Sequence, residues 1–195
     1  ELGPGDGSLT KILIKTLKKF PKFNSIKKIF LYEKSRLLRK IQKENIKNNQ
    51  IKWIGNFNEI KKGPIVFFGN EFFDAIPIKQ FKKNNEKVFE KYLSLRKGSN
   101  IEVIFKKAPK NIIKELKKFN LLNGNGIIEY PKQGLRELDK ITRIIKKYSG
   151  GILLIDYGFE GTRKIDTLQS VMRHKKNKLF SNIGEADITS LVNFT

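Results

Sequence analysis

Cysteine is absent from this chain of 195 residues, and histidine, tryptophan and methionine each occur once. The lack of cysteine excludes a disulfide scaffold, thiolate catalysis and any Cys-ligated zinc or iron–sulfur site. The only histidine, His174, cannot by itself build a His-based metal cage. We therefore expect no metal site, and the absence of cysteine fits a reducing compartment.

Long hydrophobic runs are also missing. The longest apolar run, from Gly150 to Ile155, has the length of a strand and falls far short of the roughly 20 residues that cross a bilayer. The composition nevertheless includes 38% hydrophobic residues and 15 phenylalanines. A folded domain with a real core is therefore expected, with no membrane span.

Positive charge dominates, with 41 Lys and Arg against 19 Asp and Glu and a net charge of +22. Lysine, isoleucine and asparagine are over-used together along the whole chain, as an A/T-rich coding sequence would produce without selection for a phosphate-binding face. The lysine pairs do not interleave with aromatic residues as a base-stacking platform would. The charge alone therefore does not indicate a nucleic-acid partner.

Helical and strand periodicities alternate along much of the chain, which predicts an α/β fold. Ser8 is expected to cap the first helix and Pro21 to end it. The apolar runs 65–68 and 151–156 suggest strands covered on both faces, as in a parallel sheet. The expected helices are 9–20, one from 35 onward, 110–122 and 135–148, and the expected strands are 29–32, 51–54, 65–68, 127–130, 151–156 and 186–194.

A different rhythm occupies residues 76–105. The segments 76–81, 88–95 and 101–105 read as antiparallel strands, with turns at 83–85 and 97–100. We predict a single domain over 1–195, a Rossmann-like sheet with this antiparallel β element inserted. Because insertions at strand ends carry specificity in such folds, 76–105 is our candidate for substrate recognition; packing against a partner subunit is the alternative.

Four residues at the front, Glu1, Gly3, Gly5 and Gly7, form an E-x-G-x-G-x-G pattern ahead of the first helix. Glycines there allow the backbone to turn and to approach a ligand closely. The dinucleotide pattern G-x-G-x-x-G fails because the third glycine comes one residue early. The spacing and the leading acid suit S-adenosylmethionine, which has an amino acid end and no pyrophosphate; a turn that merely links strand to helix is the alternative.

Such a glycine turn normally follows a buried strand, yet here it starts at residue 1. A Rossmann-like sheet without that first strand would lack its centre. The chain also stops directly after an expected strand. We therefore expect the sequence to be a fragment of a longer protein, truncated at the front and at the back.

Glu33 follows the expected strand 29–32 and lies 26 residues after Gly7, close to where an acidic residue binds both ribose hydroxyls in nucleotide-binding sheets. A carboxylate suits this task because it accepts two hydrogen bonds at once. Phe57, just past the expected strand 51–54, is a candidate to flank the adenine. A surface role for Glu33 and a core role for Phe57 are the alternatives.

A second set of polar residues follows the run 65–68. Asn70, Glu71 and Asp74 bracket two phenylalanines at the carboxyl end of a strand, where open α/β sheets bind ligands. Asp156 emerges from the run 151–156 in the same way. We expect Asn70 in the cofactor site and Glu71, Asp74 and Asp156 as catalytic candidates; capping or turn roles are the alternatives.

These motifs, taken in order, resemble the MidA family. The resemblance covers essentially the whole chain and is most specific in N-E-F-F-D-A-I-P and I-D-Y-G. The matching blocks are 1–5, 33–42, 70–77, 155–158, 167–169 with His174, and 184–189. Two positions depart from the family pattern, because family members commonly have His and Asp where this chain has Ser190 and Asn193.

The resemblance implies a class I methyltransferase that uses S-adenosyl-L-methionine. The family includes a mitochondrial complex I assembly factor that methylates a protein arginine, so a complex I subunit is the implied partner. The implied location is the bacterial cytoplasm or the mitochondrial matrix. It also implies further sequence before Glu1 and after Thr195, and it makes His174 a candidate substrate-side group; a solvated helix residue is the alternative.

Two other functions remain open at this point. Nucleic-acid amine methylation is favoured by the net charge and by the spacing of Asn70 and Phe73, but Glu71 and Asp74 would then lie beside anionic phosphates. A non-catalytic assembly chaperone with a methyltransferase fold is the third possibility. The intact glycine turn together with Glu33 argues against it.

Overall fold

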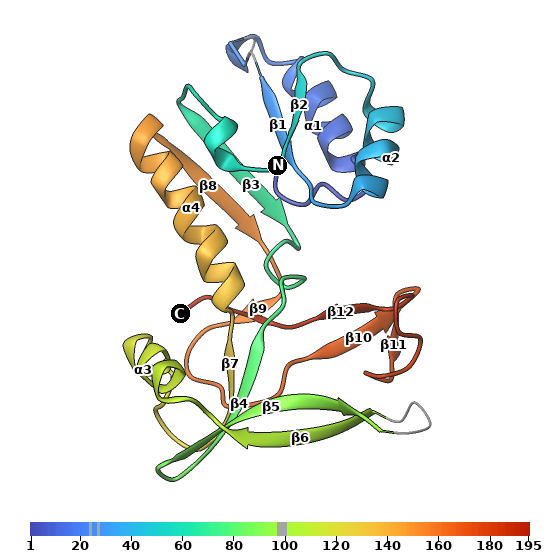
Figure 1. Ribbon diagram of the computed structural model, residues 1–195. Helices are drawn as coiled ribbons and strands as arrows, with labels where there is room; N and C mark the ends of the chain where they lie inside the picture. Colours follow the sequence, from blue (N-terminus) through green and yellow to red (C-terminus); the bar gives the residue numbers. More distant parts are fainter. Residues whose placement is uncertain (24, 27, 97–100) are drawn as a thin grey trace. The chain divides into compact units, whose positions relative to one another are not determined.

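The computed structural model describes residues 1–23, 25–26, 28–96 and 101–195 (Figure 1). The chain forms two compact units, which are described separately. The first contains Glu1–Phe72 and Glu137–Asp156, and the second contains Phe73–Arg136 and Tyr157–Thr195. The expected turn at 97–100 lies outside the described residues.

Parallel strands build the first unit. β1 (Ile29–Tyr32) pairs with β2 (Ile51–Ile54), and β3 (Ile65–Asn70) pairs with β8 (Gly150–Ile155). Leu2 forms isolated bridges to Tyr32 and to Gly69, so it links the end of β1 to the end of β3. The strands expected over 29–32 and 51–54 are confirmed with the same bounds.

Three helices belong wholly or largely to this unit. They are α1 (Ser8–Leu17), α2 (Arg36–Ile46) and α4 (Lys132–Tyr148), of which α4 contributes from Glu137 onward. The predicted cap at Ser8 is wrong, because Gly7 occupies the N-cap position with left-handed backbone and Ser8 is already helical. α1 also ends before Pro21, which begins the short 3₁₀ helix Pro21–Phe23.

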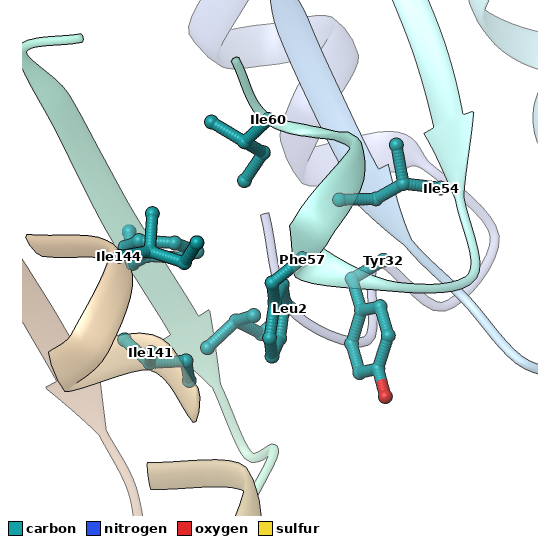
Figure 2. Packing of buried hydrophobic residues seen from close by; sticks show 8 residues of the cluster. Leu2, Tyr32, Ile54, Phe57, Ile60, Ile141 and Ile144 are labelled. Carbon is teal, nitrogen blue, oxygen red and sulfur yellow. The ribbon is translucent and has the colours of Figure 1, made fainter. Parts of the chain in front are cut away.

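The core of the first unit gathers side chains from the front turn, β1, β2, β3 and α4 (Figure 2). Ile141 and Ile144 of α4 pack in one cluster with Phe67 of β3. Because α-helical residues three apart share a face, α4 presents one apolar stripe to this cluster. The cluster is Leu2, Tyr32, Ile54, Phe57, Ile60, Phe67, Ile141 and Ile144.

The expectation that β3 and β8 are covered on both faces is wrong. Val66 is 73% exposed, and Leu153 and Ile155 are 57% and 54% exposed. Side chains alternate across a strand, so the residues that face α4 are covered and these three lie on the opposite face. The continuous apolar run therefore predicted the strands but not their burial.

An antiparallel sheet in the order β6–β5–β4–β7 dominates the second unit. It confirms an inserted antiparallel element, but the strand expected over 127–130 also belongs to it and pairs with β4, rather than continuing the α/β alternation. α3 (Lys110–Lys118) packs on one face through Ile112 and Leu116. The strands are β4 (Lys79–Asn84), β5 (Lys87–Leu95), β6 (Ile101–Lys107) and β7 (Gly126–Tyr130).

Short strands complete the second unit. The single strand expected over 186–194 divides into β12 (Asp187–Thr189), which pairs with β10 (Gln169–Met172), and β13 (Val192–Asn193), which pairs with β9 (Gly158–Phe159). β10 also forms a hairpin with β11 (Lys175–Asn177). None of the helices in the described residues is long and apolar enough to cross a membrane.

Candidate functional site

The glycine turn starts at the carboxyl ends of β1 and β3. The Leu2 N–H donates to the carbonyl of Phe68 at 2.9 Å, and the Gly3 N–H donates to the carbonyl of Tyr32 at 3.0 Å. Leu2 is 1% exposed, so the turn is anchored by a buried side chain as well as by backbone bonds. The following residues leave this edge of the sheet, where open α/β folds bind ligands.

Gly5 and Gly7 use the freedom that only glycine supplies cheaply. Gly5 has φ +56, and a Cβ built on it meets no described atom within 4 Å apart from those of its chain neighbours. Gly7 has φ +86, and a Cβ there would lie 2.7 Å from Cδ1 of Ile46. The space around the Gly5 α-carbon is therefore open, while Gly7 allows α1 and α2 to approach each other.

The Glu1 side chain accepts a hydrogen bond from the hydroxyl of Thr10 in α1. Thr10 is buried, at 2% exposure. Burial raises the pKa of the Glu1 carboxyl from 4.5 to about 7. A positively charged group placed beside this carboxyl would stabilise its ionised form, which is what the ammonium of an amino acid ligand offers.

Glu33 follows β1 and is 8% exposed. Its Oε1 accepts a hydrogen bond from the Ser35 N–H at 2.7 Å, and its Oε2 accepts one from Nε2 of Gln42 at 3.3 Å. Ser35 also caps α2, because its hydroxyl oxygen accepts from the Leu38 N–H at 3.3 Å. Each carboxylate oxygen has further acceptor capacity, so Glu33 is held in place and can still accept from two ligand hydroxyls.

Gln42 also belongs to the candidate site, although the sequence alone assigned it no role. It lies on α2, is 0% exposed, and donates from Nε2 to the carbonyl of Gly5 at 2.7 Å as well as to Glu33. The available signal was its position, four residues before Ile46, which places a polar side chain on the buried stripe of an amphipathic helix. Gln42 thereby connects the glycine turn to the acid.

Phe57, the candidate to flank an adenine, lies in the hydrophobic core at 2% exposure. Its ring centroid is 4.4 Å from that of Tyr32 and 5.6 Å from that of Phe67. This favours the packing alternative that the sequence left open. Contact with an adenine stays a prediction, and it would require the ring to become accessible.

The structure brings two of the three catalytic candidates to neighbouring strand ends. Asn70 is paired with Ile155 in the β3–β8 ladder, and the Glu71 N–H donates to the carbonyl of Ile155 at 2.8 Å. Glu71 and Asp156 therefore both directly follow this last ladder pair. Glu71 has φ +52, an uncommon left-handed backbone for a residue with a side chain.

Asp74 belongs to the second unit, where it is 8% exposed. Its carbonyl accepts a hydrogen bond from the Ser190 N–H at 3.1 Å. Ser190, one of the two positions that depart from the MidA pattern, is 5% exposed. The backbone near Asp74 is thus fastened to the segment between β12 and β13.

His174 is not a helix residue, which corrects the alternative considered from composition. It lies with Arg173 between β10 and β11, and the two residues have φ +59 and +50. Two successive left-handed residues in a two-residue connection are typical of a type I′ hairpin turn. His174 is therefore an exposed turn residue of the second unit.

Residues 1–195 match a family model described as "Putative S-adenosyl-L-methionine-dependent methyltransferase". The chain belongs to this methyltransferase family. The match spans every residue of the chain and confirms the MidA-type resemblance. S-adenosyl-L-methionine is thus the cofactor of the family, and no part of the chain falls outside the matched region.

Among curated proteins, the chain is 31% identical over 147 residues to "Protein arginine methyltransferase NDUFAF7 homolog, mitochondrial" of Caenorhabditis elegans, covering 74% of this chain and 34% of that protein. It is 25% identical over 222 residues to "Protein arginine methyltransferase NDUFAF7, mitochondrial" of Homo sapiens, covering 100% of this chain and 49% of the human protein. The chain spans about half the length of most of the curated relatives it matches, and a third of the C. elegans protein.

The fold of this chain is similar to that of a solved crystal structure. The crystal structure of a "likely methyl transferase from Burkholderia thailandensis bound to S-adenosyl-homocysteine" has a TM-score of 0.80 at 21% identity, covering 99% of this chain and 52% of that one. A second structure from the same organism has a TM-score of 0.78. This likeness confirms the predicted class I methyltransferase fold.

Proposed function

We propose that the protein transfers a methyl group from S-adenosyl-L-methionine to an arginine side chain of a protein. The observation that carries this proposal is the junction of the glycine turn and Glu33 through Gln42, whose amide bonds both. A merely connecting turn would not need a fully buried amide that also holds a carboxylate. Family membership supplies the identity of the cofactor.

The residues present fit that cofactor. Glu33 would accept hydrogen bonds from both ribose hydroxyls, since its carboxylate is already oriented by Ser35 and Gln42. Gly5 would let the ligand approach the backbone closely. Glu1 would accept from the α-ammonium, and Asn70, exposed at the end of β3, would complete this edge of the site. Bound there, the cofactor supplies a methyl group on a positively charged sulfur.

The acceptor chemistry explains the acidic residues. A guanidinium has a pKa near 12.5 to 13.8, so neutralising it before attack at pH 7 would cost about 8 kcal/mol. Carboxylates from Glu71 and Asp156, which directly follow the last β3–β8 ladder pair, would instead orient the guanidinium and hold its charge on the nitrogens that do not attack. A catalytic role for Asp74, which belongs to the second unit, stays a prediction from the sequence. The carbon–sulfur bond breaks as the carbon–nitrogen bond forms, and the nitrogen loses its proton afterwards to solvent.

For the acceptor itself, we propose a subunit of respiratory complex I, as the MidA resemblance implies. The curated relatives carry "protein arginine methyltransferase" and "mitochondrial" in their names, which supports an arginine acceptor and, for a eukaryotic source, the mitochondrial matrix. A bacterial source would place the protein in the cytoplasm.

Within the insertion 76–105, we assign substrate recognition to one exposed face of β5 and β6. Leu93 and Val103 face each other across β5 and β6, and both are exposed together with Leu95 and Phe105 on the same face. Lys82 lies over the Phe105 ring at 5.8 Å. Apolar side chains beside lysines suit a segment of the substrate protein that combines apolar and acidic residues.

Incubation of the protein with labelled S-adenosyl-L-methionine and cell extract, followed by mass spectrometry of the labelled acceptor, tests the proposal. We expect methylarginine in a protein. Glu71→Gln and Asp74→Asn should reduce the label strongly while cofactor affinity stays normal. The proposal is wrong if label appears on nucleic acid or on another side chain, and the catalytic assignment is wrong if both variants transfer methyl groups normally.

The insertion has its own test in the same assay. Leu93→Asp with Val103→Asp should lower methyl transfer to the acceptor severalfold through a raised KM, without changing cofactor affinity. Ser94→Asp, on the opposite face of β5, is the matched control and should retain transfer. Equal loss in both variants would contradict a recognition role for this face.

A further inference from the structure

Gln42 is a polar side chain at a position where an amphipathic helix places apolar ones. It is completely buried, and its amide makes three hydrogen bonds to three separate segments. Nε2 donates to the Gly5 carbonyl at 2.7 Å and to Oε2 of Glu33 at 3.3 Å, while Oε1 accepts from the indole N–H of Trp53 at 2.8 Å. The amide therefore leaves neither of its ends without a partner.

Burying an amide is unfavourable unless its hydrogen bonds are made, so its presence needs a reason. A leucine of similar volume would fill the same space against Ile46 and Gly7 without needing partners. Two of the three groups that Gln42 binds, the Gly5 carbonyl and the Glu33 carboxylate, belong to the proposed cofactor site. The third bond, from Trp53, orients the amide so that its N–H₂ group points at both of them.

We propose that Gln42 is a positioning residue for the cofactor, which fixes the Glu33 carboxylate and the glycine turn in the arrangement that binds the adenosine portion. This inference rests on the proposed cofactor site. Gln42 does not touch the reacting atoms; it acts through Glu33 and Gly5. An amide is required because a carboxylate at position 42 would lose both donors and would lie beside the carboxylate of Glu33.

Trp53 gives the proposal a direct optical signal. It is the only tryptophan in the chain, and its indole N–H is bonded to the amide that holds Glu33. Binding of a ribose to Glu33 should therefore change the intrinsic fluorescence of the protein. The same titration measures affinity in the wild type and in variants that retain Trp53.

The experiment titrates adenosine into wild type, Gln42→Glu and Gln42→Leu, with fluorescence and calorimetry as readouts. Adenosine serves as the probe because it carries the ribose and lacks the ammonium that would bind Glu1. At pH 8, Gln42→Glu should bind adenosine at least tenfold more weakly than wild type. As the pH falls to about 5.5, this ratio should narrow, because the introduced carboxyl group can again donate one hydrogen bond once it is protonated.

Gln80→Glu is the matched control. Gln80 is a buried glutamine of the second unit, 6% exposed, and donates to Glu129 and Asp166. The control should lose thermal stability but keep adenosine affinity within twofold of wild type. Thermal unfolding followed by circular dichroism identifies any Gln42 variant that fails to fold. If Gln42→Leu does not fold, the adenosine affinity of Gln42→Glu, which is closest to glutamine in shape, tests the inference.

Three results would overturn the inference. Wild-type affinity in Gln42→Glu at pH 8 would show that the amide does not position the site. A ratio that does not change with pH would reduce Gln42 to a structural role. If the wild type binds neither adenosine nor S-adenosyl-L-methionine, both this inference and the proposed function are wrong. That result differs from the first two, in which the wild type still binds.

Discussion

Tyr32 donates a hydrogen bond from its hydroxyl to Oε2 of Glu137 at 3.1 Å, across 105 positions of the chain. Glu137 is 7% exposed and also accepts from Lys34 at 3.3 Å and from Lys140 at 3.1 Å. Since Tyr32 directly precedes Glu33, this bond fastens the end of β1, and the start of the candidate site, to α4 of the same unit.

The Tyr32–Glu137 hydrogen bond should stabilise the fold measurably. Tyr32→Phe removes one donor to a buried carboxylate, so we expect the free energy of unfolding to fall by about 1.5 to 3 kcal/mol. Chemical denaturation measures this loss. Tyr148→Phe, on the same helix as Glu137, is the control and should be nearly neutral; an unchanged midpoint for Tyr32→Phe would contradict a stabilising role.

Because of the Glu137 carboxylate, we expect the fold to lose stability at acid pH. Burial opposes ionisation of Glu137, but the bonds from Lys140, Lys34 and Tyr32 prevail and lower its pKa below 4.5. A carboxyl with a lowered folded-state pKa contributes stability above its unfolded pKa and loses that contribution as the pH falls through the folded value. Stability should therefore fall below about pH 4.5, and less steeply in Glu137→Gln. An equally steep fall in the variant would count against this.

The pKa of Glu1 is shifted in the opposite direction to that of Glu137, so its effect on stability has the opposite dependence on pH. Burial raises the pKa of the Glu1 carboxyl to about 7. The protonated carboxyl therefore favours the folded state at low pH, and the stability of the fold declines as the pH rises from the unfolded-state pKa toward 7. If Glu1 binds the cofactor ammonium as proposed, its ionised form is the one that binds, so affinity for S-adenosyl-L-methionine should rise between about pH 6 and 8. Glu1→Gln should bind more weakly with a flat profile over this range, and an unchanged slope in this variant would exclude Glu1 from the site.

Two glycines of the same turn should respond differently to alanine. Gly7→Ala combines φ +86 with a Cβ at 2.7 Å from Ile46, so it should cost at least about 1 to 2 kcal/mol of stability. Gly5 has φ +56, and a Cβ there meets no described atom within 4 Å apart from its chain neighbours. Gly5→Ala should therefore lower the melting temperature less than Gly7→Ala does, and its main effect should be a loss of cofactor affinity. Thermal unfolding and calorimetry separate the two effects; identical profiles would contradict the division of roles.

Local signals in the sequence predicted the strands that frame the site and the glycine turn between them. These local signals did not predict that β3 and β8 are buried on one face only, because a continuous apolar run does not indicate whether one or both faces of a strand are covered. The pairing of β7 with β4 joins segments far apart in the chain, so no local pattern encoded it. Gln42 was missed because periodicity marks position 42 as buried but does not say what a polar group there would bind.

The most direct measurement of the central claim is a calorimetric titration of S-adenosyl-L-methionine into the wild-type protein and into Glu33→Gln. The account predicts one molecule bound per chain, and at least tenfold weaker binding in the variant, because the amide can accept at only one of the two oxygen positions that the ribose hydroxyls need. Equal affinity in the two proteins, or no binding heat in the wild type, would contradict it.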